Sequence, residues 1–366
     1  MKSAFANKTS VTPVNYPLPA HARPIVVIGA GGIVRDAHLP AYRLAGFTVA
    51  ALHDLDRAKA TGLAATFGVP RVPATLAEAI RTAPPAAVFD VAVPAPALAA
   101  VLEALPDRAA VLIQKPFGEN LPQARALLAL CRRKQLVAAV NFQLRFAPAI
   151  AAARTLIAGG AIGDLHDMEI RVTVHTPWHL WKFLEGAPRV EILYHSIHHL
   201  DLIRSFLGDP RGIHALTLRH PATPRLAATR SAMLLDYGDS IRANVTVNHG
   251  HNFGSRHQES YVKWEGTRGA IKAQLGLLMN YPTGSDDYLE QCVLDEKGGP
   301  EMWQPILVEG TWYPHAFIGT MSSLMRFANG ETPELPTRVE DACRTMALVE
   351  AAYQSSANGS TPIPSL

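Results

Sequence analysis

The chain has 366 residues, of which 48% are hydrophobic and 18% charged, and its formal net charge is +3. This composition is typical of a globular protein with a substantial core, and the length is enough for about two domains. The small net charge and the lack of any run of like charges exclude electrostatic binding to nucleic acid or to a membrane surface as the main function.

The three cysteines, Cys131, Cys292 and Cys343, are far apart and form neither a C-x-x-C pair nor a disulfide framework. This cysteine usage favours a reducing compartment, so we expect a cytoplasmic protein. No apolar run reaches the ~18 residues that a membrane helix needs, so we expect no membrane span.

Residues 1–23 are polar, contain prolines and lack the continuous apolar stretch of a signal peptide. We interpret this segment as an N-terminal arm that packs on its own subunit or on a neighbouring one. A disordered tail is the alternative interpretation.

The segment 24–142 alternates short apolar runs with helical stretches. Residues 25–28 form an apolar run that ends at Gly29, which is typical of a buried parallel strand that enters a turn. Further strands are predicted at 48–52, 87–91, 110–113 and 137–140, and helices at 34–45, 57–67, 97–105 and 123–135. This alternation predicts an α/β domain, a Rossmann-type doubly wound parallel sheet with helices on both faces.

After about Phe142 the pattern changes to a helix at 147–158 followed by longer stretches of alternating polar and apolar residues. The turns "DYGDS" and "EGTRG" indicate antiparallel hairpins. Helices are predicted at 190–207 and 339–357. Residues 143–366 therefore read as an α+β domain with a large open, mostly antiparallel sheet. Because such a sheet needs its outer face covered, we expect a homodimer or a homotetramer.

The stretch "GAGGIVRDAHLPAY" follows the first predicted strand and carries Gly29, Gly31 and Gly32. The first glycine of a dinucleotide-binding loop permits a tight turn, and the second lets the backbone approach the pyrophosphate. Val34 stands where the third glycine usually packs the helix against the strand. Main-chain N–H groups at the start of the following helix can still face a phosphate, so the loop predicts dinucleotide binding.

Asp54 closes the second predicted strand. In this place a carboxylate accepts hydrogen bonds from the adenosine ribose and repels a 2′-phosphate, which favours NAD over NADP. Arg57 lies nearby in sequence and can soften that preference. The alternative role for Asp54 is that of a helix N-cap.

Lys115 directly follows an apolar strand and precedes Pro116. Ligands of doubly wound sheets bind outside the carboxyl ends of the strands, so this lysine can reach a substrate hydroxyl or carbonyl. Desolvation can lower the pKa of a lysine toward neutrality, which suits proton transfer. The alternative is an ordinary surface lysine.

The segment "VEILYHSIHHLDLIRSFLGDP", residues 190–210, is rich in histidine. Helical spacing predicts that Tyr194 and His198 share one face and that His195 and His199 share another. One interpretation is acid–base chemistry by His198 with Tyr194 one turn away. A second is a metal site, but no H-E-x-x-H motif or third ligand is present, so we expect no metal. A third is that core hydrogen bonds satisfy the histidines.

Taken together, these stretches resemble the Gfo/Idh/MocA family of nicotinamide-dependent oxidoreductases over about residues 24–360. The matching stretches are "GAGGIVRDAHLPAY", "ALHDLDRAKATGLAATFGVP", "VAVP", "QKP", "VNFQLRFAPAI", "IAGGAIGDLHDMEI" and "RFANGETPELPTRVEDACRTMALVEAAYQSSANG". Several such stretches in the right order are far more specific than one glycine loop.

The resemblance implies NAD as the cofactor, with NADP possible, bound between the glycine loop and the strand ends of the first domain. The cofactor contacts that it implies are Gly29, Gly31, Gly32, Ile33, Asp54, Arg57, Val93, Pro94, Lys115 and Gln143.

Lys115 matches the catalytic lysine of the family. His198 matches the histidine of its D-x-G-x-H-x-x-D stretch, and Asp201 matches the last aspartate. Tyr194 stands where the family has its first aspartate, and a tyrosine with a pKa near ~10 donates a hydrogen bond but is a weak base. Gln114 replaces the usual glutamate beside the lysine.

The substrates implied by the resemblance are mostly sugars, cyclitols and their derivatives, lying on the sheet of the second domain. Residues 175–183 would then lie over the pocket, with Trp178 and Trp181 as flat faces for a sugar ring. Packing between subunits or domains is the alternative for both tryptophans. The implied substrate contacts are Lys115, Trp178, His179, Tyr194, His195 and His198.

These expectations combine into an NAD-dependent dehydrogenase or reductase acting on a secondary alcohol or ketone of a sugar, cyclitol or glycoside. His198 or Lys115 would take the hydroxyl proton during oxidation, and Tyr194 would orient the reacting oxygen. Two alternatives stay open. One is a non-catalytic NAD(H)-binding sensor or scaffold, and the other is glycoside cleavage through transient oxidation by bound NAD.

Overall fold

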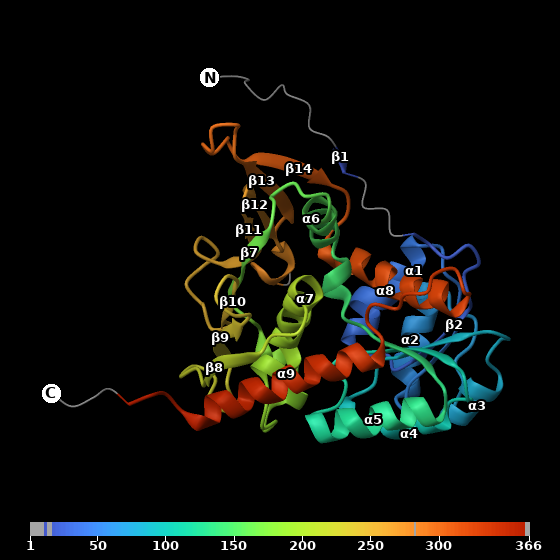
Figure 1. Ribbon diagram of the computed structural model, residues 1–366. Helices are drawn as coiled ribbons and strands as arrows, with labels where there is room; N and C mark the ends of the chain where they lie inside the picture. The colour runs from blue at the N-terminus through green and yellow to red at the C-terminus, as the bar shows by residue number, and fades with distance from the viewer. Residues whose placement is uncertain (1–10, 13–16, 282, 363–366) are drawn as a thin grey trace.

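The structure is a computed structural model that describes residues 11–12, 17–281 and 283–362. Within these residues the chain forms a five-stranded sheet and a nine-stranded sheet, with helices packed against both (Figure 1). This arrangement agrees with the fold class predicted from the sequence.

The strand order of the smaller sheet, in the described part of the chain, is β3-β2-β4-β5-β6, and all its pairs are parallel. Its strands are β2 Ile25–Ile28, β3 Val49–His53, β4 Val88–Val91, β5 Ala110–Ile113 and β6 Val137–Val140. The chain order reverses between β2 and β4. The carboxyl ends of these two strands therefore form the switch point at which doubly wound sheets bind ligands.

Helices cover both faces of this sheet, and nearly every strand residue is buried, which explains the continuous apolar runs in the sequence. The helices of this part are α1 Leu39–Leu44, α2 Arg57–Phe67, α3 Leu76–Arg81, α4 Leu98–Ala104 and α5 Leu121–Arg133. The helix predicted at 34–45 begins as a π turn, Val34–His38, and continues as α1. Val34 is fully buried there.

The larger sheet has the order β1-β14-β13-β12-β11-β7-β10-β9-β8 in the part of the chain that the structure describes. Its strands are β1 Val11–Thr12, β7 Leu165–Thr173, β8 Gly212–Leu218, β9 Arg230–Asp236, β10 Arg242–Asn248, β11 Glu259–Gly266, β12 Gly269–Gln274, β13 Tyr288–Val293 and β14 Gln304–Val308. The pairs β7/β10 and β1/β14 are parallel and the others antiparallel, so the expected mostly antiparallel sheet is confirmed.

The helices of the second half lie on one side of this sheet (Figure 1). They are α6 Pro148–Ala158, α7 Ile197–Leu207, α8 Trp312–Ala328 and α9 Val339–Asn358. Helix α8, which the sequence did not predict, packs on α1 and β5 of the smaller sheet, and α9 packs on α5. Helices α8 and α9 of the second half therefore pack against the first domain.

The N-terminal arm contacts the same chain wherever it is described. Backbone pairing joins Val11–Thr12 to Leu307 and Val308 of β14. Arg23 donates from Nε to Asn329 Oδ1 at 2.7 Å, beyond the end of α8. These contacts agree with an arm that packs on its own subunit, while residues 1–10 and 13–16 lie outside the described residues.

None of the helices in the described residues is long and apolar enough to cross a membrane.

Candidate active site

The glycine loop leaves β2 at the switch point. Gly29 has φ +109°, and a Cβ added there would lie 2.3 Å from the Ala92 carbonyl oxygen, so only glycine fits. A Cβ added at Gly31 would meet no heavy atom within 4 Å. The backbone at Gly31 therefore faces open space, as a loop that receives a pyrophosphate requires.

Asp54 directly follows β3 and stabilises the glycine loop through hydrogen bonds. Its Oδ2 accepts a hydrogen bond from the Ala30 N–H at 2.6 Å, and its Oδ1 accepts from the Asp56 N–H at 2.8 Å. The N-cap of α2 is Asp56, whose Oδ1 accepts from the Lys59 N–H at 3.1 Å. The N-cap interpretation of Asp54 is therefore wrong. Its place beside the loop is that of a ribose-binding acid, and selection of NAD stays a prediction.

The other implied cofactor contacts surround this edge. Ile33 is half-buried, Arg57 is exposed on the first turn of α2, and Val93 and Pro94 follow β4 with Pro94 exposed. Gln143 lies in the 3₁₀ turn Gln143–Phe146 after β6 and is 1% exposed.

Two buried amide atoms near the strand ends lack partners. Gln143 Oε1 accepts from the Trp312 indole N–H at 2.7 Å, but Gln143 Nε2 has no hydrogen-bond partner among the described residues, and neither has Gln114 Oε1. Buried polar atoms are normally satisfied. A ligand that carries its own amide, such as the nicotinamide of NAD, fits a free donor and a free acceptor of this kind.

Lys115 reaches from the first domain to the second. It follows β5, and its Nζ donates to the Tyr194 carbonyl oxygen at 2.6 Å. Burial lowers the pKa of the Lys115 ammonium to about 8. The group can therefore hold or release a proton near neutral pH, as the sequence led us to expect of a proton-transfer lysine.

The turn before α7 is a π turn, Ile192–Ser196. The 3.6-residue spacing that predicts a shared face for Tyr194 and His198 does not apply across it, because a π turn is wider. The Tyr194 ring packs on Phe183 at a centroid distance of 5.7 Å, whereas the His198 ring packs on Phe142 at 6.2 Å. The two rings therefore have different aromatic neighbours, and their shared face stays a prediction.

Tyr194 lies beside Lys115, because the Lys115 ammonium donates to its main-chain carbonyl. Burial, together with the nearby Glu119 carboxylate, raises the pKa of its phenol above the ordinary value. The phenol therefore keeps its proton at neutral pH and can act as a donor but not as a base. Its contact with Lys115 goes through the main-chain carbonyl.

The three histidines of this segment are neutral at neutral pH. Burial lowers the pKa of His199 to about 4, and burial together with Lys115 and neighbouring histidines holds the pKa values of His195 and His198 well below the ordinary value. The Nδ1 atoms of His198 and His199 are buried without a hydrogen-bond partner in the described part of the chain. Core hydrogen bonds therefore do not fully satisfy these two side chains, and a neutral imidazole can accept a proton.

Trp178 is 8% exposed and packs its indole at steep angles against His195 and His249, at centroid distances of 5.1 and 5.4 Å. It shares a cluster with Leu184 inside its own domain. Trp181 is half-buried and contacts Tyr281 at 5.9 Å. His179 is exposed. Substrate contact by Trp178, Trp181 and His179 stays a prediction.

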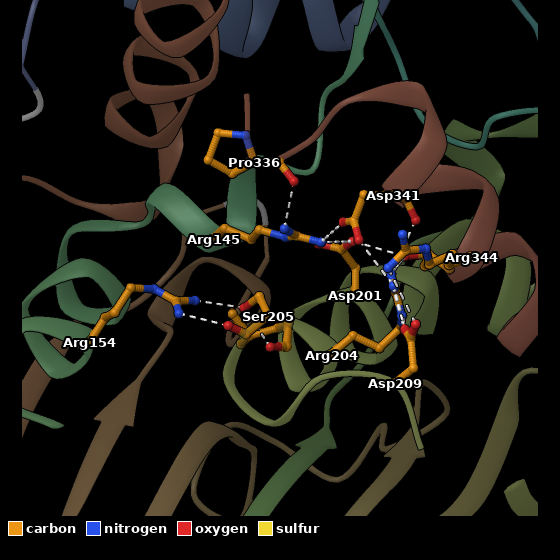
Figure 2. Close-up of polar contacts among 11 residues, drawn as sticks. Arg145, Arg154, Asp201, Arg204, Ser205, Asp209, Pro336, Asp341 and Arg344 are labelled. Atoms are coloured by element: carbon orange, nitrogen blue, oxygen red, sulfur yellow. Dashed lines mark hydrogen bonds and ion pairs between the residues drawn. The ribbon is translucent and has the colours of Figure 1, made fainter. Parts of the chain in front are cut away.

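Asp201, the match to the last family aspartate, lies in an ion-pair network with Arg145 (Figure 2). Arg145 donates from Nε and Nη2 to its two carboxylate oxygens, each at 2.6 Å, and also to Asp341 of α9. Arg204 of α7 donates to the second oxygen of Asp341 at 3.0 Å. This network fastens α7, and with it the histidine segment, to α9 and to the crossover between the domains.

Two functional candidates escaped the sequence analysis. Glu191 and His249 are 0% and 1% exposed, His249 Nε2 lies 3.8 Å from Glu191 Oε1, and the His249 ring packs on His195 at a centroid distance of 4.5 Å. They come from different segments, and no motif or spacing in the sequence joins them. Across the described residues, His, Cys, Asp and Glu side chains form no group of three placed to hold a metal ion.

A parallel sheet with a glycine-rich loop at its switch point, packed against an α+β domain, is the architecture of two-domain nicotinamide-dependent oxidoreductases. The sequence matches the oxidoreductase family with an NAD-binding Rossmann fold over residues 23–142, and the Gfo/Idh/MocA C-terminal domain over residues 150–272. The chain belongs to the Gfo/Idh/MocA family of NAD-binding oxidoreductases.

Among curated relatives, the D-apiose dehydrogenase of Rhizobium rhizogenes is 28% identical over 259 residues, which cover 68% of this chain and 71% of the relative. The D-apiose dehydrogenase of Paraburkholderia graminis is 28% identical over 352 residues, covering 92% and 88%.

Solved structures share the fold over most of their length. An oxidoreductase from Agrobacterium radiobacter, in complex with NAD+, L-tartaric acid and magnesium, superposes with a TM-score of 0.75 at 24% identity, covering 93% of this chain and 98% of that one. The aldose-aldose oxidoreductase from Caulobacter crescentus, complexed with glycerol, gives 0.74 at 17% identity, covering 93% and 99%.

Proposed function

We propose that this protein is an NAD-dependent dehydrogenase or reductase that interconverts a secondary alcohol and a ketone on a sugar, cyclitol or glycoside. The observation that carries the proposal is the hydrogen bond from Lys115 to the Tyr194 carbonyl. It places the lysine of the NAD-binding domain against the turn that carries His195 and leads into His198. The D-apiose dehydrogenases among its relatives support a carbohydrate substrate.

Different residues around the switch point would bind different parts of the cofactor. The loop Gly29–Gly32 would receive the pyrophosphate, Asp54 the ribose, and the free amide atoms of Gln114 and Gln143 the carboxamide. Arg57 leaves room for NADP as an alternative cofactor. When bound, the nicotinamide accepts or returns the hydride.

Proton transfer falls to side chains of both domains. Lys115, whose pKa burial lowers to about 8, and His198, which is neutral, can each take the hydroxyl proton during oxidation and return it during reduction. The Tyr194 phenol donates a hydrogen bond that orients the reacting oxygen. Trp178, Trp181, His179 and His195 form the wall against which the sugar lies.

The protein would work as a homodimer or homotetramer. The helices of the second half leave the outer face of the large sheet open, and Leu216, Leu218 and Leu234 on this face are 50%, 45% and 45% exposed. Self-association would cover these leucines. Light scattering after gel filtration measures the subunit count, and a purely monomeric mass would refute this part of the proposal.

The test is turnover of the purified chain with NAD+ or NADP+ and a panel of aldoses, cyclitols and glycosides that includes D-apiose. We expect reduced nicotinamide to form with at least one sugar, and NMR of the product identifies the oxidised carbon. Tight cofactor binding without turnover across the panel would favour a sensor or scaffold. Products that form without net reduced cofactor would favour glycoside cleavage through transient oxidation.

A further inference from the structure

Helix α9 packs both on the π turn that carries Tyr194 and on α5 of the first domain. Glu350 and Tyr353 are three residues apart on this helix, so their side chains share one face. Both are hydrogen-bonded to other elements of the chain. Together with Arg189 they form a cluster, which we call the α9 clamp, on the turn whose carbonyl accepts from Lys115.

The Glu350 carboxylate joins the two domains. Arg189 of the second domain donates from Nη1 to Glu350 Oε2 at 2.7 Å and from Nη2 to Oε1 at 2.9 Å, a bidentate pair. Arg189 thereby holds the pKa of the Glu350 carboxyl below its ordinary value, so the group is ionised. Oε2 also accepts from the Leu121 N–H at 3.4 Å, at the start of α5. Leu121 ends the loop of the first domain that begins with Lys115, so one carboxylate contacts both chain segments that meet at the lysine.

The Tyr353 phenol caps the π turn. Its oxygen accepts from the Leu193 N–H at 3.3 Å. Leu193 lies in the first turn of its helix, where main-chain N–H groups have no partner within the helix. The Arg189 guanidinium lies over the Tyr353 ring, with Cζ 4.7 Å from the ring centroid, a cation–π contact. Burial, together with the nearby Glu191 carboxylate, raises the pKa of the phenol, so it keeps its proton and stays neutral.

The clamped residues lie on both sides of the main-chain segment that ends at Tyr194. Arg189 directly precedes Val190, and the Val190 carbonyl accepts from the Tyr194 N–H at 2.9 Å. Leu193, which the phenol caps, directly precedes Tyr194. The Tyr194 carbonyl accepts from Lys115 Nζ at 2.6 Å. Each link from the clamp to the lysine is therefore a hydrogen bond or a neighbouring peptide.

The position of the π turn controls how much water reaches Lys115. Burial is the cause that lowers the pKa of its ammonium to about 8. His195 and His198 are the titratable groups that the lysine faces, and both are neutral at neutral pH. If the turn moved away, water would replace the carbonyl, and the pKa of the lysine would rise toward its ordinary value.

We propose that Glu350 and Tyr353 are positioning residues, which hold the π turn against Lys115 and so keep water from its ammonium. The inference rests on the proposed function, in which the Lys115 amine can take the hydroxyl proton of the substrate. The clamp acts through the main chain of the π turn. It keeps a useful fraction of the lysine in the neutral form near neutral pH, where an ordinary lysine is almost fully protonated.

The first experiment needs no turnover. The full chain, with no cofactor added, is labelled with trace acetic anhydride over a range of pH, and mass spectrometry measures the labelling of the Lys115 peptide. Only the neutral amine reacts, so the midpoint of labelling reports the pKa of Lys115. We expect a midpoint near pH 8 in the wild type, and about half to one pH unit higher in Tyr353→Phe and in Glu350→Gln. An unchanged or lower midpoint in both variants would overturn the proposal.

The second experiment uses the sugar found active in the assay above. In both variants we expect kcat/KM for oxidation at about pH 7 to fall by roughly three- to tenfold, which is the loss of neutral amine that such a shift causes. On the high-pH plateau the rate should return close to the wild-type value, because the amine is then neutral in every variant. Glu350→Asp, which keeps a charge for Arg189, should restore part of the rate. A loss that is equal at all pH values would show a merely structural role and would refute the positioning role.

Matched controls remove the same chemical groups elsewhere. Tyr237→Phe deletes a phenol that donates to the Gly208 carbonyl at 2.8 Å, at the opposite end of α7 from the π turn. Glu340→Gln deletes a carboxylate of α9 that pairs with Arg132 of α5. Both should keep the wild-type labelling midpoint of Lys115 and the wild-type pH profile. Shifts of the same size in these controls would refute a specific role of the clamp.

The two experiments separate the clamp from the proposed function. A wild type that turns over none of the sugars refutes the proposed function, while the labelling midpoint still decides whether the clamp positions Lys115. A failure of the clamp alone is seen instead as unchanged midpoints in variants of an active enzyme.

Discussion

Lys115 Nζ lies 2.6 Å from the carbonyl oxygen of Tyr194, so the lysine of one domain is anchored by the backbone of the other. A main-chain acceptor is present whatever the side chain at position 194. This explains how a tyrosine can stand where the family resemblance places an aspartate without displacing the lysine. It also separates the two roles, proton transfer by Lys115 and orientation by the Tyr194 phenol, which substitutions can test one at a time.

Lys115→Met keeps the length of the side chain and removes its proton. We expect kcat/KM for sugar oxidation to fall by about 10²–10⁴-fold, the usual contribution of general acid–base catalysis, while the melting temperature stays close to that of the wild type. His198→Gln should also lower turnover strongly. Near-normal steady-state rates in both variants would refute the proposed mechanism.

The pH dependence of the wild type should report the same lysine, whose pKa burial lowers to about 8. Oxidation needs the neutral amine as proton acceptor, so its kcat/KM should rise with pH and level off above about pH 8. Reduction needs the ammonium as donor, so it should decline above the same pH. Rate profiles in both directions check the sign, and the limb near pH 8 should be missing from the residual activity of Lys115→Met.

Tyr194→Phe removes only the phenol oxygen. Because Lys115 bonds to the main chain, the substitution leaves that contact in place, and the lost hydrogen bond should lower kcat/KM by roughly tenfold, the value of about one hydrogen bond. Initial rates across the sugar panel measure the change. A loss as large as that of Lys115→Met would show that the phenol takes part in proton transfer and would contradict the orienting role.

The sequence predicts most of the first domain because its strands are buried on both faces and therefore read as unbroken apolar runs. Helix α8 escaped prediction because Trp312–Ala328 has no exposed face, since all its residues are buried or half-buried, and because Pro314 lies in its first turn. Strands β13 and β14 also escaped prediction. They are short and half-exposed, so polar and apolar residues do not alternate clearly along them.

The residues of the candidate site also fall into some that the sequence predicts and some that it does not. Lys115 and Gly29 are readable because each sits at a strand end, where the topology alone defines a ligand edge. The π turn Ile192–Ser196 has no sequence pattern that announces it, so the sequence predicts an ordinary helix there. Glu191 and His249 become neighbours only in the folded chain, where the Glu191 N–H donates to the Ala228 carbonyl and the His249 N–H to that of Thr229, long-range contacts that local patterns do not encode.

Asp54→Ala tests cofactor selection. Hydrogen bonds to a charged group are worth about 1.5–3 kcal/mol, so the Kd for NAD should rise by roughly 10- to 100-fold. The Kd for NADP should change less, since the repulsion of its 2′-phosphate disappears at the same time. Loosening of the glycine loop through the lost Ala30 contact affects both cofactors alike, so the ratio of the two Kd values is the informative quantity.

The matched control for this substitution is Asp56→Ala. It removes the N-cap of α2, at a cost of about 1 kcal/mol in stability, but leaves the carboxylate at the end of β3. Calorimetric titration with each cofactor should give a wild-type ratio for Asp56→Ala. An unchanged ratio in Asp54→Ala would show that another residue sets the preference.

Asp201→Asn tests whether the ion-pair network of Figure 2 positions the histidine segment or takes part in the chemistry. The substitution leaves the buried Arg145 guanidinium without half of its charge partners, and breaking a buried pair costs about 3–5 kcal/mol. For a chain of this size the melting temperature should fall by roughly 5 °C. Differential scanning calorimetry measures the fall, and amide hydrogen exchange should show faster opening of α7, where Asp201 lies.

Glu340→Gln provides the comparison, because it removes the partner of Arg132 in a solvent-exposed pair. Exposed pairs contribute about 0–1 kcal/mol, so its melting temperature should stay within about 1 °C of the wild type. Below the melting range, Asp201→Asn should keep measurable turnover, and the change in kcat/KM near pH 8 that we assign to Lys115 should be the same as in the wild type. The reason is that the network positions helix α7 and does not contact the reacting atoms. A variant that melts like the wild type yet has lost turnover would place Asp201 in the reaction itself.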